Sequence, residues 1–327
     1  MTSPVSPRGD GLELDTRIAQ DAEGAALAVE LSASDFALVT ADPVALTQWQ
    51  LFSRRFKLHK FAIVSLVLLV VLMVLCFSAS WIAPFEKGKI DLLSRNEPPS
   101  SEHWFGTEEG GRDVLTDILY GGQLSLRIGM SVALVSTVVG TTFGALAGLY
   151  GKWVDQILMR LTDLFLLVPV LAVLAVALQR FGRDPLTVVL VLAGLFWMQI
   201  ARVVRGLTLS LKEKEFVEGA RAAGASGPRI ILRHILPNCI GPIMVNLTLQ
   251  VAVAIIAEST LSFLGFGVQR PDISWGNMLA DNKDNYDETI HTILFPGLAI
   301  LLTVLAVNAL GDGLRDAFDP HAKQRTD

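Results

Sequence analysis

The sequence predicts an all-α integral membrane protein with six transmembrane helices. Hydrophobic residues make up 51% of the 327 residues and charged residues only 18%, which is more apolar than ordinary globular composition. Phe61–Ala83 and Ile128–Tyr150 are uncharged runs of 23 residues each. At about 1.5 Å of rise per residue each run reaches roughly 35 Å, enough to cross a hydrocarbon core of about 30 Å. Lysine and arginine also gather on alternate connections, as the orientation of a multi-pass protein requires.

The first 42 residues are predicted to be a disordered acidic cytoplasmic tail. Up to residue 53 the chain carries eight acidic residues against Arg8 and Arg17, a charge of −6 beside −5 for the whole chain. A segment of this composition lacks the apolar surface needed for a packed core. It also holds no apolar run of signal-peptide length, so no signal peptide is expected. The acidic balance gives no reason to expect a nucleic-acid partner.

Residues 43–60 are predicted to form an amphipathic helix on the inner membrane surface. Asp42 is a capping acid, and Pro43 suits the first helical position. The segment then combines aromatic and basic side chains, namely Trp49, Phe52, Phe56, Arg54, Arg55, Lys57 and Lys60, a pattern typical of interfacial helices. The alternative is a cytoplasmic extension of the first span.

Six spans follow from the apolar runs and their breaks. They are Phe61–Ala83, Leu124–Tyr150, Ile157–Leu178, Pro185–Ala201, Ile240–Ala257 and Ile293–Leu310. Asp163 and Pro169 interrupt the third span, and the fourth is short. The first span is followed by an external loop, 84–123. A five-helix core, 124–318, then includes a cytoplasmic loop, 202–239, and an external loop, 265–291, and the chain ends in a cytoplasmic tail, 319–327.

The distribution of lysine and arginine predicts that both termini are cytoplasmic. With the N-terminus inside, 16 of these residues flank the spans on the inner side and 8 on the outer side, which is the bias that membrane proteins show. Cys76 then lies in the outer half of the first span and Cys239 at the inner mouth of the fifth. Because the two thiols are far apart on this topology, no disulfide is expected.

The cytoplasmic segment Glu218–Gly224 is predicted to be a short helix with small side chains. Gly219, Ala220 and Ala223 give a smooth face, with Glu215, Glu218 and Arg221 as polar neighbours. Gly224 suits a left-handed cap that ends the helix. A second helix is predicted from Gly227 to Leu236, with Pro237 helping to terminate it. Such a rigid unit suits docking of a helix into a partner's groove; an ordinary ordered basic loop is the alternative.

This segment resembles the cytoplasmic coupling motif of ABC importer permeases. The residues that match the motif are Glu218, Ala220, Gly224, Leu236 and Pro237. Gly219 replaces an alanine of the motif, and His234 stands where isoleucine is common. Glycine at that position should loosen the helix slightly.

Two further stretches resemble the dipeptide/oligopeptide/nickel branch of these permeases. His103–Val114 is similar to their outer segment, and Leu261–Gln269 with Ser274–Leu279 is similar to their last external loop. The resemblance runs from about Trp49 to Pro320 and is closest to the C-type subunit of a heterodimeric pair. The acidic first 45 residues have no counterpart in it.

The resemblance implies an importer-type permease core in a bacterial inner (plasma) membrane, moving peptides. It also implies three kinds of partner besides membrane lipids: a second homologous permease subunit, two ABC ATPase subunits and an external solute-binding protein. No phosphate-binding Gly-x-x-x-x-Gly-Lys-Ser/Thr motif occurs in this chain, so ATP and magnesium are expected on the ATPase subunits and no enzyme activity on this chain. No two histidines are spaced i, i+4, so no metal site is expected.

Polar residues inside the spans are candidates for a translocation path. Asn246, Gln250 and Asn308 are the candidates for lining the path. The alternative role for such residues is hydrogen bonding between helices, and this role suits Asp163 and Glu258 better. Other interpretations are the import of nickel chelates or an oligosaccharide by the same machinery, or a passive channel or scaffold. An intramembrane hydrolase is disfavoured because no catalytic arrangement is recognisable, and an ABC exporter because its ATPase is usually fused.

Overall fold

The computed structural model describes residues 48–167, 169–285 and 287–318. These residues form helices joined by turns, with a single isolated antiparallel bridge between Thr107 and Asp113. The predicted all-α class is therefore confirmed. The predicted acidic tail 1–42, the start of the amphipathic segment and the tail 319–327 lie outside the described residues.

Within the described residues, five helices are long and apolar enough to cross a membrane. They are α3 (Lys60–Phe77), α5 (Val114–Tyr150), α8 (Pro185–Leu211), the continuous helix Gly227–Phe263 that ends in α11 (Leu236–Phe263), and α13 (His291–Phe318). A sixth span results if α6 (Lys152–Leu167) and α7 (Val170–Phe181) are counted together. The shorter helices are α2 (Gln48–Leu58), α4 (Ala79–Ile82), α9 (Glu215–Ala222), α10 (Gly227–Ile230) and α12 (Trp275–Asn282).

The third predicted span is not one straight helix. The structure bends by 90° between α6 and α7, where Pro169 precedes α7 with an extended backbone. Proline lacks an amide hydrogen and disfavours helical geometry in the residue before it, so a helix breaks there. The predicted third span, Ile157–Leu178, therefore corresponds to this bent pair of helices.

The helix that contains the second predicted span begins earlier than that span. Helix α5 starts at Val114, inside the predicted external loop 84–123, because the Asp113 carboxylate accepts a hydrogen bond from the Thr116 amide at 3.1 Å and caps it. At the other side of the first span, α2 ends at Leu58 and α3 begins at Lys60. The intervening His59 caps α3 by accepting from the Ala62 amide at 3.2 Å, so α2 is a separate helix rather than an extension of α3.

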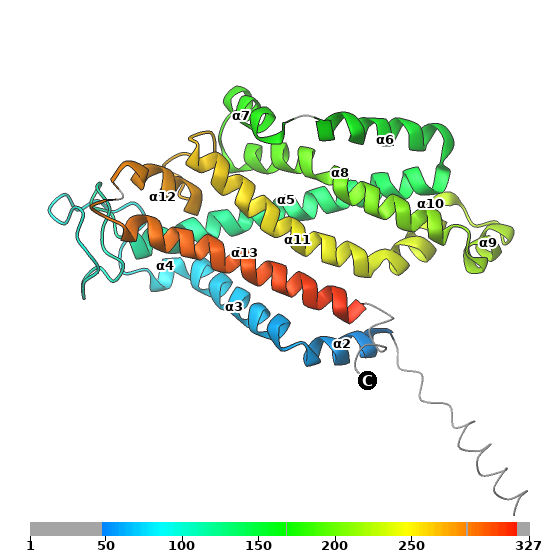
Figure 1. Cartoon of the computed structure of the whole chain (residues 1–327), viewed down its shortest axis with the longest axis horizontal. Helices are drawn as coiled ribbons and strands as arrows, with labels where there is room; N and C mark the ends of the chain where they lie inside the picture. Colours follow the sequence, from blue (N-terminus) through cyan, green and yellow to red (C-terminus); the bar gives the residue numbers. More distant parts are fainter. Residues whose placement is uncertain (1–47, 168, 286, 319–327) are drawn as a thin grey trace, which may run out of the picture. The chain divides into compact units, whose positions relative to one another are not determined.

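Helices α5 and α8 lie side by side along their lengths, and α11 packs on α5 and against α13, which in turn packs on α3 (Figure 1). Gly140, Gly144 and Gly148 bring α5 close to α8: a Cβ on Gly140 or Gly144 would collide with the carbonyl oxygen of Trp197 or Ala201. Glycine permits this close approach of two backbones.

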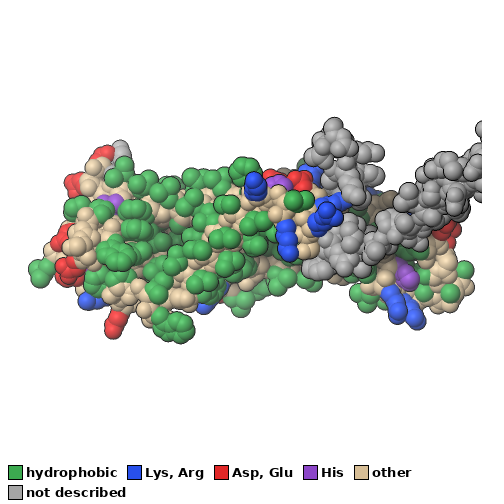
Figure 2. Space-filling view, turned by 90° about the horizontal axis from the view of Figure 1, so that it is seen from below, with side chains coloured by type: hydrophobic (Ala, Val, Ile, Leu, Met, Phe, Trp, Pro, Cys, Tyr) green, Lys and Arg blue, Asp and Glu red, His purple; other side chains and the backbone are tan. Residues whose placement is uncertain are grey.

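Figure 2 shows hydrophobic side chains over the middle of one face and charged side chains toward the two ends. On α3 and α13 the exposed apolar residues include Val64, Val74, Leu298 and Leu305. Exposed apolar surface of this extent is typical of helices that face lipid or another membrane subunit. We call the two ends the α9 end and the α12 end.

Candidate functional site

Helix α9 is the candidate site that the sequence singled out. It spans eight residues between the end of α8 and the start of α10, and it has acidic residues Glu215 and Glu218 in its first turn and Arg221 in its last. This charge order favours a short helix, because the helix dipole is positive at the N-terminus and negative at the C-terminus. Lys214 precedes the helix with an extended backbone, which defines where it begins.

Gly224 ends α9 as predicted. Its φ is +80°, in the left-handed region. The Ala225 amide donates to the Ala220 carbonyl and the Gly224 amide donates to the Arg221 carbonyl, both at 3.0 Å. These two bonds define a Schellman motif, in which a glycine satisfies the last carbonyl groups of a helix.

The α9 surface is exposed and mostly small. Gly219, Ala222 and Ala223 are exposed, and a Cβ on Gly219 would meet open space. Phe216 is the one large apolar residue among them and is 45% exposed. An exposed helix with small side chains and one aromatic anchor fits a partner that supplies a groove.

The predicted termination at Pro237 was wrong. Helix α10 continues through a π-helical turn, Ile231–Ile235, directly into α11. The Leu236 amide donates to the Ile231 carbonyl, five residues back. In a regular α-helix the Pro237 ring would press on the carbonyl of residue 233, and the wider π-turn leaves room for it. The predicted second helix is therefore continuous with the long helix that follows.

Helix α9 is joined at both ends to long helices that are themselves tied to neighbours. Residues 212–214 join it to α8, with the Lys214 amide donating to the Leu211 carbonyl at 3.1 Å. Two arginines of α8 hold α6: Arg202 pairs with Asp163 at 2.5 Å, and an Arg205 Nη2 lies 2.6 Å from Asp155 Oδ2. Asp163 thus takes part in an interhelical ion pair.

The predicted path residues have different surroundings. Gln250 is 6% exposed, and its Nε2 donates to the Phe196 carbonyl of α8 at 3.5 Å. Asn246 donates to the Pro242 carbonyl of its own helix at 2.8 Å, and Asn308 on α13 is half-buried. A role for these three in a path stays a prediction.

Glu258 bonds between helices, as the sequence suggested. Its carboxylate is fully buried and accepts from Ser262 at 2.8 Å and from Ser125 of α5 at 3.3 Å. Ser125 also accepts from the Trp275 amide at the start of α12, at 3.1 Å. This buried polar group therefore joins α5, α11 and α12.

Sequence reasoning missed a charge cluster at the α12 end. Arg270 lies 2.8 Å from Asp281, 3.4 Å from Glu108 and 3.6 Å from Asp117. Burial alone would lower the pKa of Arg270, but the charges of these three carboxylates outweigh it and hold the pKa above its usual value. Arg112 pairs with Glu108 as well. The cluster joins the segment before α5, the start of α5 and the segment around α12.

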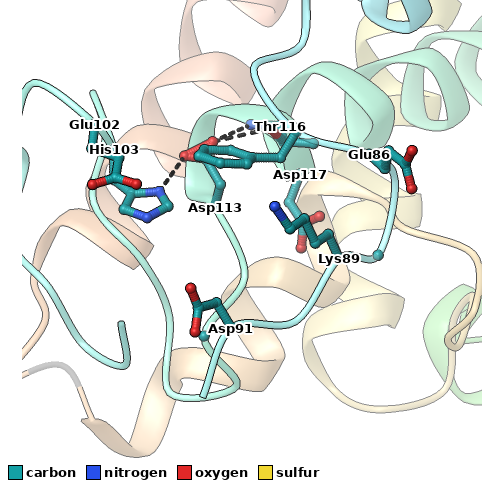
Figure 3. Close-up of a pocket in the computed structure, with 11 residues that line it drawn as sticks. Glu86, Lys89, Asp91, Glu102, His103, Asp113, Thr116 and Asp117 are labelled. Carbon is teal, nitrogen blue, oxygen red and sulfur yellow. Dashed lines mark hydrogen bonds and ion pairs between the residues drawn. The ribbon is translucent and has the colours of Figure 1, made fainter. Parts of the chain in front are cut away.

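A small polar cavity lies beside this cluster (Figure 3). His103 and Asp113 line it together, with His103 Nδ1 3.3 Å from Asp113 Oδ1, and Lys89 and Asp117 also line it. Its volume is about 60 Å³, whereas small-molecule sites usually measure roughly 300–1,000 Å³. Among the described residues no group of three or more His, Cys, Asp or Glu side chains is placed to hold a metal ion.

Comparison with known proteins gives matches over most of the chain. Residues 140–324 match the family described as the binding-protein-dependent transport system inner membrane component, and residues 47–99 match the N-terminal transmembrane domain of oligopeptide transport permease C. A putative peptide transport system permease protein of Brucella abortus is 41% identical over 281 residues, covering 86% of this chain and 93% of the relative.

Two further relatives match this chain over most of their own lengths. The oligopeptide transport system permease protein OppC of Mycobacterium tuberculosis is 40% identical over 83% of this chain and 94% of its own length. The dipeptide transport system permease protein DppC of Alkalihalophilus pseudofirmus is 38% identical over 85% of this chain and 92% of its own length.

Proposed function

Since the chain belongs to the family of binding-protein-dependent transport system inner membrane components, we propose that it is the peptide-carrying permease subunit of an ATP-driven importer. It is a multi-pass inner membrane protein and a transport component, not a catalytic subunit. The names of three relatives refer to peptides, oligopeptides and dipeptides. They support di- and oligopeptides as the cargo.

The observation that carries the proposal is the geometry of α9. The helix is exposed on its small-residue face and ends at a left-handed glycine, and the next helix, α10, is continuous through the π-turn with α11. The residues assigned to ATPase coupling are Glu215, Glu218, Gly219, Ala220, Arg221, Ala223, Gly224, Leu236 and Pro237. An element that must transmit a force needs short, well-defined connections, and α9 has them on both sides.

The remaining subunits follow from this role. A second homologous permease subunit completes the path, and two ATPase subunits bind ATP and magnesium and dock on α9. An external solute-binding protein meets the segments 84–123 and 265–291, so the α12 end faces outward and the α9 end faces the cytoplasm. Closure of the ATPases moves residues 213–224, and the two permease subunits rock against each other. Access to the path then alternates between the two sides of the membrane, in two states of different affinity for cargo.

Copurification of ATPase subunits with the tagged chain tests the docking role. Gly224→Val places a β-branched side chain at φ +80°, a strain on the order of 1–2 kcal/mol in left-handed geometry, and the ATPase subunits should be lost. Gly88→Val is the matched control, because Gly88 has φ +76°, also in open space, in the segment before α5.

Undiminished copurification with Gly224→Val and with Glu218→Lys would contradict the docking role and favour a passive channel or scaffold. Cargo is tested separately, by uptake of labelled di- and oligopeptides into cells that carry the complete system. Uptake of a nickel chelate or an oligosaccharide in place of peptides would reassign the cargo and leave the machinery unchanged.

A further inference from the structure

Val217 differs from every other residue of α9. It is the one α9 residue that is buried, with no exposed surface, whereas its neighbours Phe216 and Glu218 are exposed. No side chain of α9, all of whose residues are described, makes a hydrogen bond or an ion pair with the helices around it. Apart from its two chain connections, α9 is therefore held by packing: Val217 makes its buried contact, and the half-exposed ring of Phe216 lies near the His234 ring of the π-turn, with centroids 6.5 Å apart.

The cluster that receives Val217 lies on the helix that continues into the membrane. It consists of Val217, Ile230, Ile235 and Cys239, each at most 3% exposed. We call it the α9 joint. Its members come from α9, α10, the π-turn and α11, and the ends of α5 and α8 pack around it through Leu149, Leu207 and Leu211.

The joint sits at the point where the long helix departs from regular α-helical geometry. Ile235 is the last residue of the π-turn, in which the Leu236 amide reaches back to Ile231. Pro237 follows at once and has no amide hydrogen to donate. Single π-turns inside α-helices are frequent at functional sites, and the missing amide of Pro237 leaves one fewer hydrogen bond to oppose a small displacement there.

We propose that Val217 is a positioning residue for transport: it passes the displacement of α9 to the π-turn and so to α11. The proposal rests on the docking of ATPase subunits on α9 proposed above. Val217 itself need not touch the ATPase or the cargo, since it is buried beneath the docking face. A close-packed apolar contact transmits displacement because it has little room to compress.

Hydrogen exchange on the assembled complex tests this role without knowledge of the cargo. Exchange is measured with magnesium and a non-hydrolysable ATP analogue, and without nucleotide. In the wild type, nucleotide should change exchange both in α9 and in the π-turn amides of Ile231–Ile235. In Val217→Ala the nucleotide-dependent change in exchange should remain in α9. At the π-turn it should fall about tenfold, because the burial free energy of the two carbon groups removed corresponds to about that factor in an equilibrium constant.

Two further variants protect the test against simple misfolding. Val217→Ile keeps the joint filled and should preserve the response of the π-turn. Ile230→Val removes one methylene from the opposite side of the joint, and the response should fall about fourfold. The yield and monodispersity of each complex are compared with those of the wild type.

The outcomes separate the two proposals. No nucleotide effect on α9 itself, in the wild type, would refute the docking of ATPases on α9. A nucleotide effect on α9 together with an undiminished π-turn response in Val217→Ala and Ile230→Val would refute only the role of Val217. Loss of the π-turn response in Val217→Ile as well as in Val217→Ala would also count against transmission through packing.

Discussion

Single-methyl substitutions inside α9 and at its C-terminal glycine should act in opposite directions. Gly219 and Gly224 are both exposed, and a Cβ on either one meets nothing within 4 Å. Gly219 lies inside the helix, whereas Gly224 has a φ of +80°. The steric environment is therefore the same at the two positions, and only the backbone conformation differs.

The magnitudes follow from that difference. Gly219→Ala should stabilise α9 by about 0.8–1.0 kcal/mol, because alanine loses less conformational entropy in a helix than glycine. Gly224→Ala should destabilise it by about 1–2 kcal/mol, the strain of an L-residue in the left-handed region. These values correspond to roughly four- to fivefold tighter closure of α9 in the first variant and roughly five- to thirtyfold looser closure in the second.

Native-state hydrogen exchange in nanodiscs measures both effects. The amides of Ala225 and Gly224, which close the Schellman motif, report the opening of the C-terminal end of α9. They should exchange more slowly in Gly219→Ala and faster in Gly224→Ala. Gly224→Asn should fall between the wild type and Gly224→Ala, because asparagine tolerates left-handed geometry. Shifts of the same sign in the two alanine variants would refute the assignment of their effects to backbone conformation.

Three other outcomes are expected. Gly144→Ala should destabilise the protein by about 1–3 kcal/mol through overpacking against α8, whereas Gly194→Ala should not, because a Cβ there meets open space. Thermal unfolding in detergent measures both variants, and equal effects would contradict the close α5–α8 contact. Arg270→Met should destabilise the α12 end by about 2–4 kcal/mol, since Glu108 and Asp117 would stay buried without the arginine, and Arg270→Lys should destabilise it less. Unfolding midpoints that match the wild type would show that the charge cluster does not stabilise this end. Cys76 and Cys239 are free and buried, so both should react with a maleimide only after denaturation, as mass spectrometry would show; a single mass corresponding to a disulfide would be inconsistent with this.

Local properties of the chain were predictable. The long helices follow from apolar runs that no soluble fold requires, and Gly224 was predicted as a left-handed cap because that requirement is set within a few residues. Pro237 shows the limit of such signals. Proline stops an isolated helix, but the wider π-turn before Pro237 leaves room for its ring, and no sequence rule predicts that turn.

Contacts between distant segments were not predictable. Arg270 and Glu108 are 162 positions apart, so their ion pair depends on how the segments at the α12 end come together. Likewise, the start of α5 at Val114 was missed because its first turns contain Asp117 and lack a continuous apolar run. Val217 was passed over because burial in an eight-residue helix depends on the helices beneath it.

The glycine contact between α5 and α8 means that neither helix can slide along the other without lifting off it. Helix α5 has 37 residues, which at about 1.5 Å each gives a lever roughly 55 Å long. One of its tips adjoins the α9 joint, and the other carries Asp117 in the charge cluster. A tilt of α5 by a few degrees about one tip would therefore displace the other tip, on the opposite side of the membrane, by several ångströms.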